Sequence, residues 1–110
     1  MKTVFHISQN QLWPEVIANI QNSIYQYGES DYTIEVVAVG QAILGYIAPE
    51  LKDDFNELNN EYKVKLSICH NAMNGANVTP DMLESFINIV PAGIYRLIEL
   101  QENGYSYVKP

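Results

Sequence analysis

The sequence predicts the α/β class: a three-layer α/β/α single domain over residues 1–110, with a mainly parallel five-stranded sheet. Short β-branched runs alternate along the chain with longer amphipathic segments, which is typical of strands joined by crossover helices. The run TIEVVAV at 33–39 is almost continuously apolar, as in parallel strands covered on both faces. A length of 110 residues with 47% hydrophobic side chains is sufficient for one domain with a continuous core.

The first half of the chain is expected to supply two strands and two helices. Residues 3–7 form an apolar run of strand type. Pro14 fits the first position of a helix that ends at Gly28. After the second strand, residues 42–50 fit either a short helical turn or a buried loop. Apolar residues then recur at intervals of three or four over residues 51–62, which predicts an amphipathic helix.

The second half is expected to add three strands and two helices. Alternating polar and apolar residues predict a strand over 63–68, and residues 79–86 have a threonine cap and a first-turn proline typical of a helix start. Residues 87–90 and 105–108 are the fourth and fifth strands, and the last helix between them ends at Gly104. The core face of that helix is expected to consist of Ile94, Leu97 and Ile98.

Charge and composition exclude several classes of function. With a formal net charge of -7 and only six scattered lysine and arginine residues, the sequence offers no basic patch for nucleic acid or an anionic membrane. No stretch approaches the roughly 18 apolar residues of a membrane span, and the start MKTVFHISQN lacks the apolar core of a signal peptide. We therefore expect a cytoplasmic protein with no nucleic-acid or membrane partner.

The common catalytic motifs are missing. The sequence contains no GxGxxG, Walker loop, GxSxG or CxxC motif, which argues against nucleotide, hydrolase and dithiol chemistry, and we expect no cofactor. The spacing of Cys69, His6 and His70 does not match a zinc site, so no metal is expected. Cys69 is the only cysteine, which rules out an intramolecular disulfide.

Cys69 is the strongest candidate for chemistry, because ligands of parallel sheets collect beyond the carboxyl ends of the strands. If the following HNAMN starts a helical turn, its backbone N–H groups and dipole favour a nucleophilic thiolate. The alternative is a small buried hydrophobic side chain. His6 fits a hydrogen-bonded histidine of the core or rim better than a ligand, and His70 need not point toward its neighbour. The turn PAG at 91–93 is either an ordinary turn or a small-anion site at a helix start.

Several segments together resemble the DsrE/DsrF-like family, the intracellular sulfur-relay proteins related to DsrE and TusD. They are VFHIS, IEVVAVG, VKLSICHNAM, INIVPAGIYRLIELQENGY and the ending YVKP, and the resemblance runs from Lys2 to Pro110. It implies an α/β domain that assembles into trimers or hexamers and, in the sulfur-relay members, a cysteine that accepts sulfur as a persulfide. Many relatives have a histidine before the glycine that follows the second strand, whereas this chain has Val39.

The resemblance favours a homo-oligomeric sulfur carrier or sulfurtransferase-like protein with Cys69 as the nucleophile and with sulfur-donor and sulfur-acceptor proteins as partners. Backbone N–H groups of Asn71 and Ala72 are expected to stabilise the thiolate. The expected lining of the substrate pocket is His6, Asn10, Gly40, His70, Asn71, Ala72, Pro91 and Gly93. The alternative is a non-catalytic oligomeric binding module that uses the same cleft for a small anionic metabolite or a protein tail.

Overall fold

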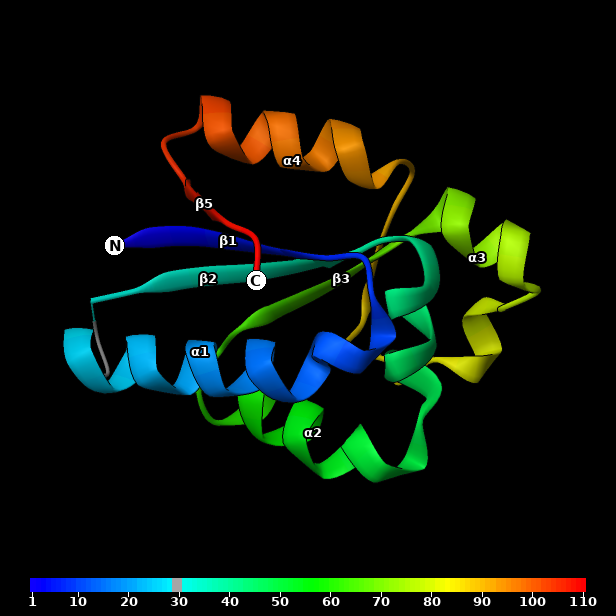
Figure 1. Cartoon of the computed structure of the whole chain (residues 1–110), viewed down its shortest axis with the longest axis horizontal. Coiled ribbons are helices and arrows are strands. Elements are labelled where there is room, and N and C mark those ends of the chain that lie inside the picture. Colours follow the sequence, from blue (N-terminus) through cyan, green and yellow to red (C-terminus); the bar gives the residue numbers. More distant parts are fainter. Residues whose placement is uncertain (29–30) are drawn as a thin grey trace.

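The structure, a computed structural model that describes residues 1–28 and 31–110, is organised around one parallel sheet (Figure 1). Its strands run in the order β4-β3-β2-β1-β5, and every neighbouring pair is parallel. They are β1 Lys2–Ile7, β2 Thr33–Ala38, β3 Lys65–Cys69, β4 Asn88–Val90 and β5 Ser106–Val108. β2 is buried along its whole length after its first residue, as a central strand covered on both faces should be.

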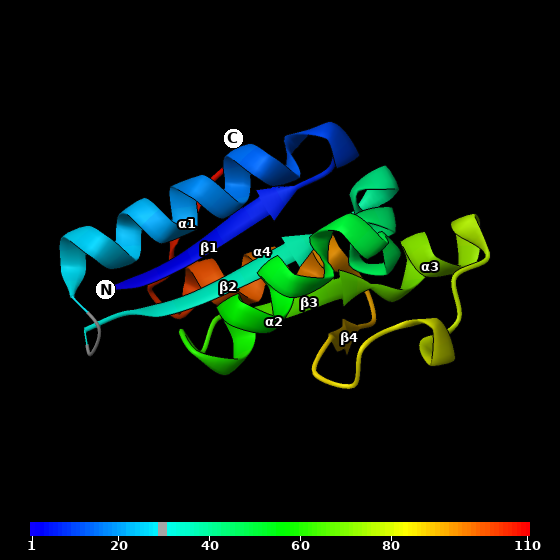
Figure 2. The same ribbon diagram turned by 90° about the horizontal axis from the view of Figure 1, so that it is seen from below.

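Helices cover both faces of this sheet, as Figures 1 and 2 show. α1 Trp13–Tyr27 and α2 Lys52–Asn60 lie against one face, and α4 Gly93–Glu102 lies against the other. α3 His70–Ala76 follows β3 directly and extends beyond the carboxyl edge of the sheet. The predicted three-layer α/β/α class with a mainly parallel five-stranded sheet is confirmed.

Short 3-10 helices form several of the connections. They are η1 Asn10–Leu12, η2 Gly40–Ile47, η3 Pro49–Leu51 and η4 Pro80–Met82. The segment at 42–50, which fits either a turn or a loop by sequence, therefore consists mostly of the helical turns η2 and η3. Within residues 1–28 and 31–110, no helix has both the length and the apolar composition needed to cross a membrane.

Most of the core lies between the sheet and the layer of α1 and α2. Trp13, Tyr46 and Phe55 pack there with ring centroids 4.9 to 5.1 Å apart. The indole Nε1 of Trp13 donates a hydrogen bond of 2.8 Å to the carbonyl oxygen of Ala42. This packing requires Gly45, because a Cβ at that position would lie 2.0 Å from Trp13 Nε1. The buried cluster on the α4 side is smaller and comprises Val4, Val37, Leu97 and Leu100.

The prediction of a helix over residues 79–86 is wrong. The structure has only η4 there, and Leu83 directly after it is extended, with φ -96° and ψ 150°. The hydroxyl of Thr79 donates to the carboxylate of Asp81, whereas a helix cap would bond a backbone N–H group. A threonine cap and a first-turn proline are therefore not enough where no apolar face continues the helix.

The core face of α4 also differs from the expected one. Leu97 is buried as expected, but Ile94 and Ile98 are 68% and 49% exposed, and Leu100 lies in the core. Gly93, Leu97 and Leu100 are spaced by four and three residues, so this stripe is the one that faces the sheet. The two isoleucines instead form part of an apolar outer surface.

Candidate functional site

Cys69 lies at the junction of two elements. It is the last residue of β3 and the residue that precedes α3, and its side chain is 7% exposed. Its Sγ accepts a hydrogen bond of 3.3 Å from the backbone N–H group of Gly93, the first residue of α4. An N–H group at the start of a helix carries a partial positive charge, and here it is directed at the sulfur atom.

Gly93 makes this contact possible because it has no side chain. A Cβ at this position would lie 2.3 Å from Val39 Cγ1 and 3.3 Å from Cys69 Cβ. The turn PAG thus brings the first residue of α4 unusually close to the ends of β2 and β3. A larger residue would have to push the helix away from the thiol.

A shallow cavity of about 300 Å³ opens beside Cys69 at the carboxyl edge of the sheet. Most of its wall is apolar. The lining residues are His6, Val39, Cys69, Asn71, Ala92, Gly93, Ile94 and Leu97. A group bound next to the thiol would therefore be partly shielded from water, which strengthens polar contacts made there.

His6 contributes an imidazole to this cavity from the neighbouring strand β1. Its Nδ1 is hydrogen-bonded to the hydroxyl of Tyr107 on β5, at 2.6 Å, and the two rings pack with centroids 5.8 Å apart. Burial, and secondarily the positive charge of Lys109, lower the pKa of His6 below its ordinary value of 6.5. The imidazole is therefore uncharged at neutral pH.

The structure brings four of the predicted site residues to one cavity: His6, Cys69, Asn71 and Gly93. The other predicted residues lie elsewhere, and they are Asn10, Gly40, His70, Ala72 and Pro91. Asn10 is an exposed residue of η1, and Gly40 is an exposed residue with φ +54° that starts η2. His70 is exposed, Ala72 packs against the large core, and Pro91 lines a separate hollow.

The structure also corrects the prediction of which backbone N–H groups contact the Cys69 sulfur. The N–H groups of Asn71 and Ala72 were the expected donors, but the side chain of Cys69 makes no capping bond to α3. The hydrogen bond to Sγ comes from Gly93, across the cavity and 24 residues away in sequence. This donor follows from the topology of the sheet. Because β4 pairs directly with β3, the turn PAG that follows β4 lies beside Cys69.

Sequence reasoning missed a buried charge that contacts α4, the helix that supplies Gly93 to this site. Glu35 is 2% exposed in β2, where it pairs with Arg96 of α4. A single carboxylate inside the otherwise apolar run TIEVVAV was the signal that could have revealed it, because a buried charge requires a partner. The walls formed by Ala92, Ile94 and Leu97 were missed because the register of α4 was not predictable in detail.

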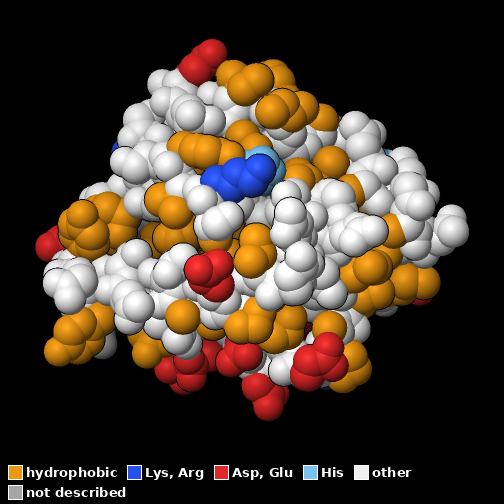
Figure 3. Space-filling view, viewed as in Figure 1, with side chains coloured by type: hydrophobic (Ala, Val, Ile, Leu, Met, Phe, Trp, Pro, Cys, Tyr) orange, Lys and Arg blue, Asp and Glu red, His pale blue; other side chains and the backbone are white. Residues whose placement is uncertain are grey.

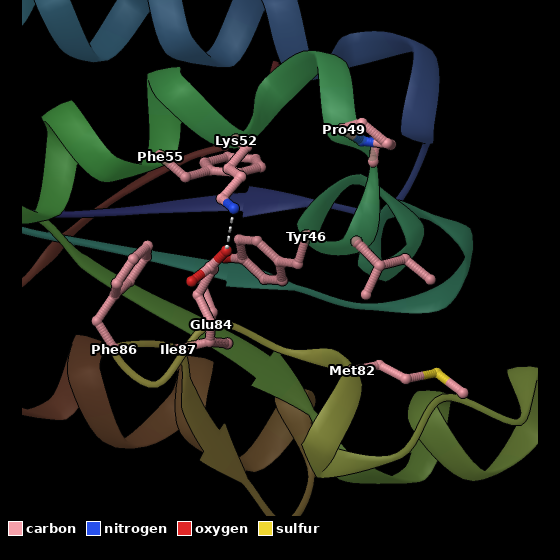
Figure 4. A pocket seen from close by; sticks show the side chains of 10 residues that line it. Tyr46, Pro49, Lys52, Phe55, Met82, Glu84, Phe86 and Ile87 are labelled. Atoms are coloured by element: carbon pink, nitrogen blue, oxygen red, sulfur yellow. Dashed lines mark ion pairs between the residues drawn. The ribbon is translucent and has the colours of Figure 1, made fainter.

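A second cavity, shown in Figure 4, lies where α2 and η3 approach the loop before β4. The rings of Tyr46, Phe55 and Phe86 surround it, and Lys52 and Glu84 form an exposed ion pair of 3.5 Å at its mouth. Burial raises the pKa of Tyr46 well above its ordinary value, and its hydroxyl donates to the carbonyl oxygen of Ser67. This cavity contains no cysteine or histidine in its lining and offers no nucleophile comparable to Cys69.

A parallel five-stranded sheet with a thiol at its carboxyl edge defines the chain as an α/β protein with a cysteine-bearing edge site. A family model matches residues 16–110, and the chain belongs to the DsrE/DsrF-like family. A comparison with curated protein sequences gave no match.

Two solved structures show the same fold. The protein of unknown function MTH1491 from Methanobacterium thermoautotrophicum has a TM-score of 0.90 and 24% sequence identity, over 99% of this chain and 98% of that one. The ychN protein from E. coli has a TM-score of 0.77 and 10% identity, over 100% of both chains. At these identities the likeness establishes the fold alone.

Proposed function

We propose that the chain is a sulfur carrier, which accepts sulfur as a persulfide on Cys69 and passes it to another protein. The observation that carries the proposal is the position of the thiol, whose Sγ receives the Gly93 N–H group at 3.3 Å beside an open cavity. This contact supports the nucleophilic thiolate. Membership of the DsrE/DsrF-like family supports sulfur as the cargo.

The exchange needs one thiol and no cofactor. In loading, the thiolate of Cys69 attacks the outer sulfur of a donor persulfide, R–S–SH. A new S–S bond forms on Cys69, the S–S bond of the donor breaks, and the donor leaves as the thiolate R–S⁻. Unloading is the same exchange, in which the thiolate of an acceptor protein attacks the outer sulfur of the Cys69 persulfide. The reducing cytoplasm, where a lone thiol stays free, is the expected compartment.

His6 and Asn71 are the polar groups that would bind the transferred sulfur or its carrier. Tyr107 holds Nδ1 of His6, so Nε2 is the nitrogen directed to a ligand in this proposal. Because its pKa is lowered, His6 is neutral near pH 7 and acts as a hydrogen-bonding group without adding a full charge beside the thiolate. Asn71 lines the same cavity and supplies an amide.

We further propose that the chain forms a homo-oligomer, a trimer or hexamer, through the outer surface of α4 and β5. This apolar face consists of Ile94, Tyr95, Ile98, Tyr107 and Val108, all exposed. Figure 3 shows hydrophobic side chains over this part of the molecule, whereas acidic side chains gather mainly on the side of α2. Contact through this largely apolar face, away from the acidic side of α2, lets chains with a net charge of -7 associate without bringing their most acidic surfaces together.

The intact mass of the protein after incubation with a cysteine desulfurase and cysteine tests the carrier function. We expect a gain of one sulfur atom that a reductant reverses and that the Cys69→Ala variant does not show. Polysulfide is the second donor, because it does not depend on recognition between two proteins. No gain with either donor would refute the carrier and would favour the non-catalytic binding module.

A further inference from the structure

We infer that Glu35 and Arg96 are positioning residues for Cys69, because their partly buried ion pair holds the first turn of α4 where the Gly93 N–H group reaches the thiol. This inference deepens the proposed function and rests on it, since it concerns the reactivity of the proposed nucleophile. Neither residue lines the cavity beside Cys69. Their effect on the thiol is therefore exerted through the placement of the helix.

The ion pair consists of two hydrogen bonds, which fix the orientation of the Arg96 guanidinium relative to the Glu35 carboxylate as well as the distance between them. Arg96 Nε lies 2.9 Å from Oε2 of Glu35, and Arg96 Nη2 lies 2.7 Å from Oε1. Two parallel hydrogen bonds hold the planar guanidinium in the plane of the carboxylate. Arg96 follows Gly93 by three residues, which is nearly one turn of α4. The ion pair with Glu35 therefore holds the helix about one turn from its first residue.

The same carboxylate also anchors the strand that carries the thiol. The hydroxyl of Ser67 donates to Oε2 of Glu35 at 2.9 Å, and Nδ2 of Asn88 donates to that hydroxyl oxygen at 3.0 Å. Ser67 and Cys69 are two residues apart on β3, so their side chains lie on the same face of the sheet. One carboxylate oxygen thus joins β3 to α4 close to the contact between Cys69 and Gly93.

Stability alone is a weak reason for this pair. Burying the Glu35 carboxylate and part of the Arg96 guanidinium costs desolvation, and apolar residues of similar volume often stabilise a fold equally well or better. An apolar pair does not fix the register of a helix against a strand in the same way. The register matters here, because the fit of Gly93 against Val39 and Cys69 leaves no space even for a methyl group.

The double variant E35M/R96M separates positioning from stability. It replaces both charges with apolar side chains of similar length, and we expect it to retain a native circular dichroism spectrum. We expect iodoacetamide to alkylate its Cys69 about three- to tenfold more slowly than in the wild type at neutral pH, as for a weakened hydrogen bond to a charged acceptor. The pH profile of alkylation should move to higher pH. A purely structural pair would leave both readouts unchanged in the folded protein.

Two further variants make the test decisive. Arg96→Lys keeps the charge but loses the fork, and we expect its alkylation rate to fall by about two- to threefold. Glu99→Gln is the matched control, because Glu99 bonds the outer side of the same guanidinium and leaves the contact with Glu35 in place. We expect the wild-type rate for this control. If E35M/R96M does not fold, Arg96→Lys alone decides the question.

Wild-type alkylation rates in the folded Glu35 and Arg96 variants would overturn the inference. The measurement needs no sulfur donor, so its failure is distinct from failure of the proposed function. A wild-type protein that never gains sulfur refutes the carrier, whatever the alkylation rates are. A wild-type protein that gains sulfur while all variants react alike refutes only the positioning role.

Discussion

His6 and Tyr107 are hydrogen-bonded side chain to side chain, with 2.6 Å between Nδ1 and the hydroxyl oxygen, although they are 101 positions apart in the sequence. The bond crosses from β1 to β5, the outermost strand on that side of the sheet. It fixes the orientation of an imidazole that lines the cavity of Cys69. The geometry of the candidate site therefore depends on the last strand as well as on the cysteine.

Acidification is expected to destabilise the fold through His6. Burial and Lys109 lower its folded-state pKa below 6.5, so between the lowered value and 6.5 the unfolded chain binds more protons at this residue than the folded chain does. The free energy of unfolding must then fall as the pH is lowered through that window. The His6→Gln variant lacks this titration.

Urea unfolding of the wild type and His6→Gln at two pH values measures the effect. We expect the wild type's advantage in free energy of unfolding to be smaller at about pH 5.5 than at about pH 7.5, on either side of the ordinary histidine value. A difference that does not depend on pH would contradict a lowered pKa of His6.

Gly93→Ala is expected to slow the alkylation of Cys69. The added Cβ would meet Val39 Cγ1 at 2.3 Å and Cys69 Cβ at 3.3 Å, so the start of α4 has to move away from the thiol. The matched variant Val39→Ala/Gly93→Ala removes the closer of the two contacts and should recover part of the rate. Equal rates for wild type and Gly93→Ala would show that the N–H contact does not control reactivity.

Gly45→Ala is expected to be strongly destabilising, by about 1–3 kcal/mol or more, because its Cβ would lie 2.0 Å from the Trp13 ring in the packed core. Gly75 in α3 is the matched control, since nothing lies within 4 Å of a Cβ there. Gly75→Ala should be neutral or stabilising by about 0.5–1 kcal/mol, as alanine favours a helix. Thermal or urea unfolding compares the two, and equal effects would disprove the close packing at Gly45.

Ile98→Glu tests the proposed oligomer. A charge on the apolar face of α4 and β5 opposes contact between copies, so we expect dissociation toward monomers. Size-exclusion chromatography with light scattering measures the mass at micromolar concentration. Tyr25→Glu, on the exposed surface of α1, is the control that should leave the mass unchanged. A monomeric wild type would refute the oligomer outright.

The fold was largely predictable because each central element has a clear periodicity. The continuous apolar run of β2 indicates a buried strand, and the spacing of Phe55 and Leu58 in α2 indicates an amphipathic helix. The prediction was wrong where a local signal had no tertiary support, as at Thr79 and Pro80. It was also wrong for the core face of α4, where Ile94 and Leu100 are equally apolar and only packing distinguishes them.

The candidate site was predictable in part. The rule that ligands gather at the carboxyl ends of parallel strands led to Cys69, His6 and Gly93, which line one cavity. Proximity in sequence was a poorer guide, since His70 follows Cys69 directly and yet is exposed outside the cavity lining. Contacts between distant residues, such as that of Glu35 with Arg96, depend on a helix register that sequence spacing does not determine.

The pairing of β5 with β1 has a consequence for synthesis of the chain. Thr3, Val4 and Phe5 of β1 pair with Ser106, Tyr107 and Val108, so β1 is synthesised about 100 residues before β5, and one of its edges stays unpaired until β5 follows. Until then an apolar strand presents open hydrogen-bonding groups to neighbouring nascent chains. A copy truncated before Ser106 would keep that edge open and would lack the hydroxyl that orients His6, so incomplete copies would be both prone to aggregate and defective at the site.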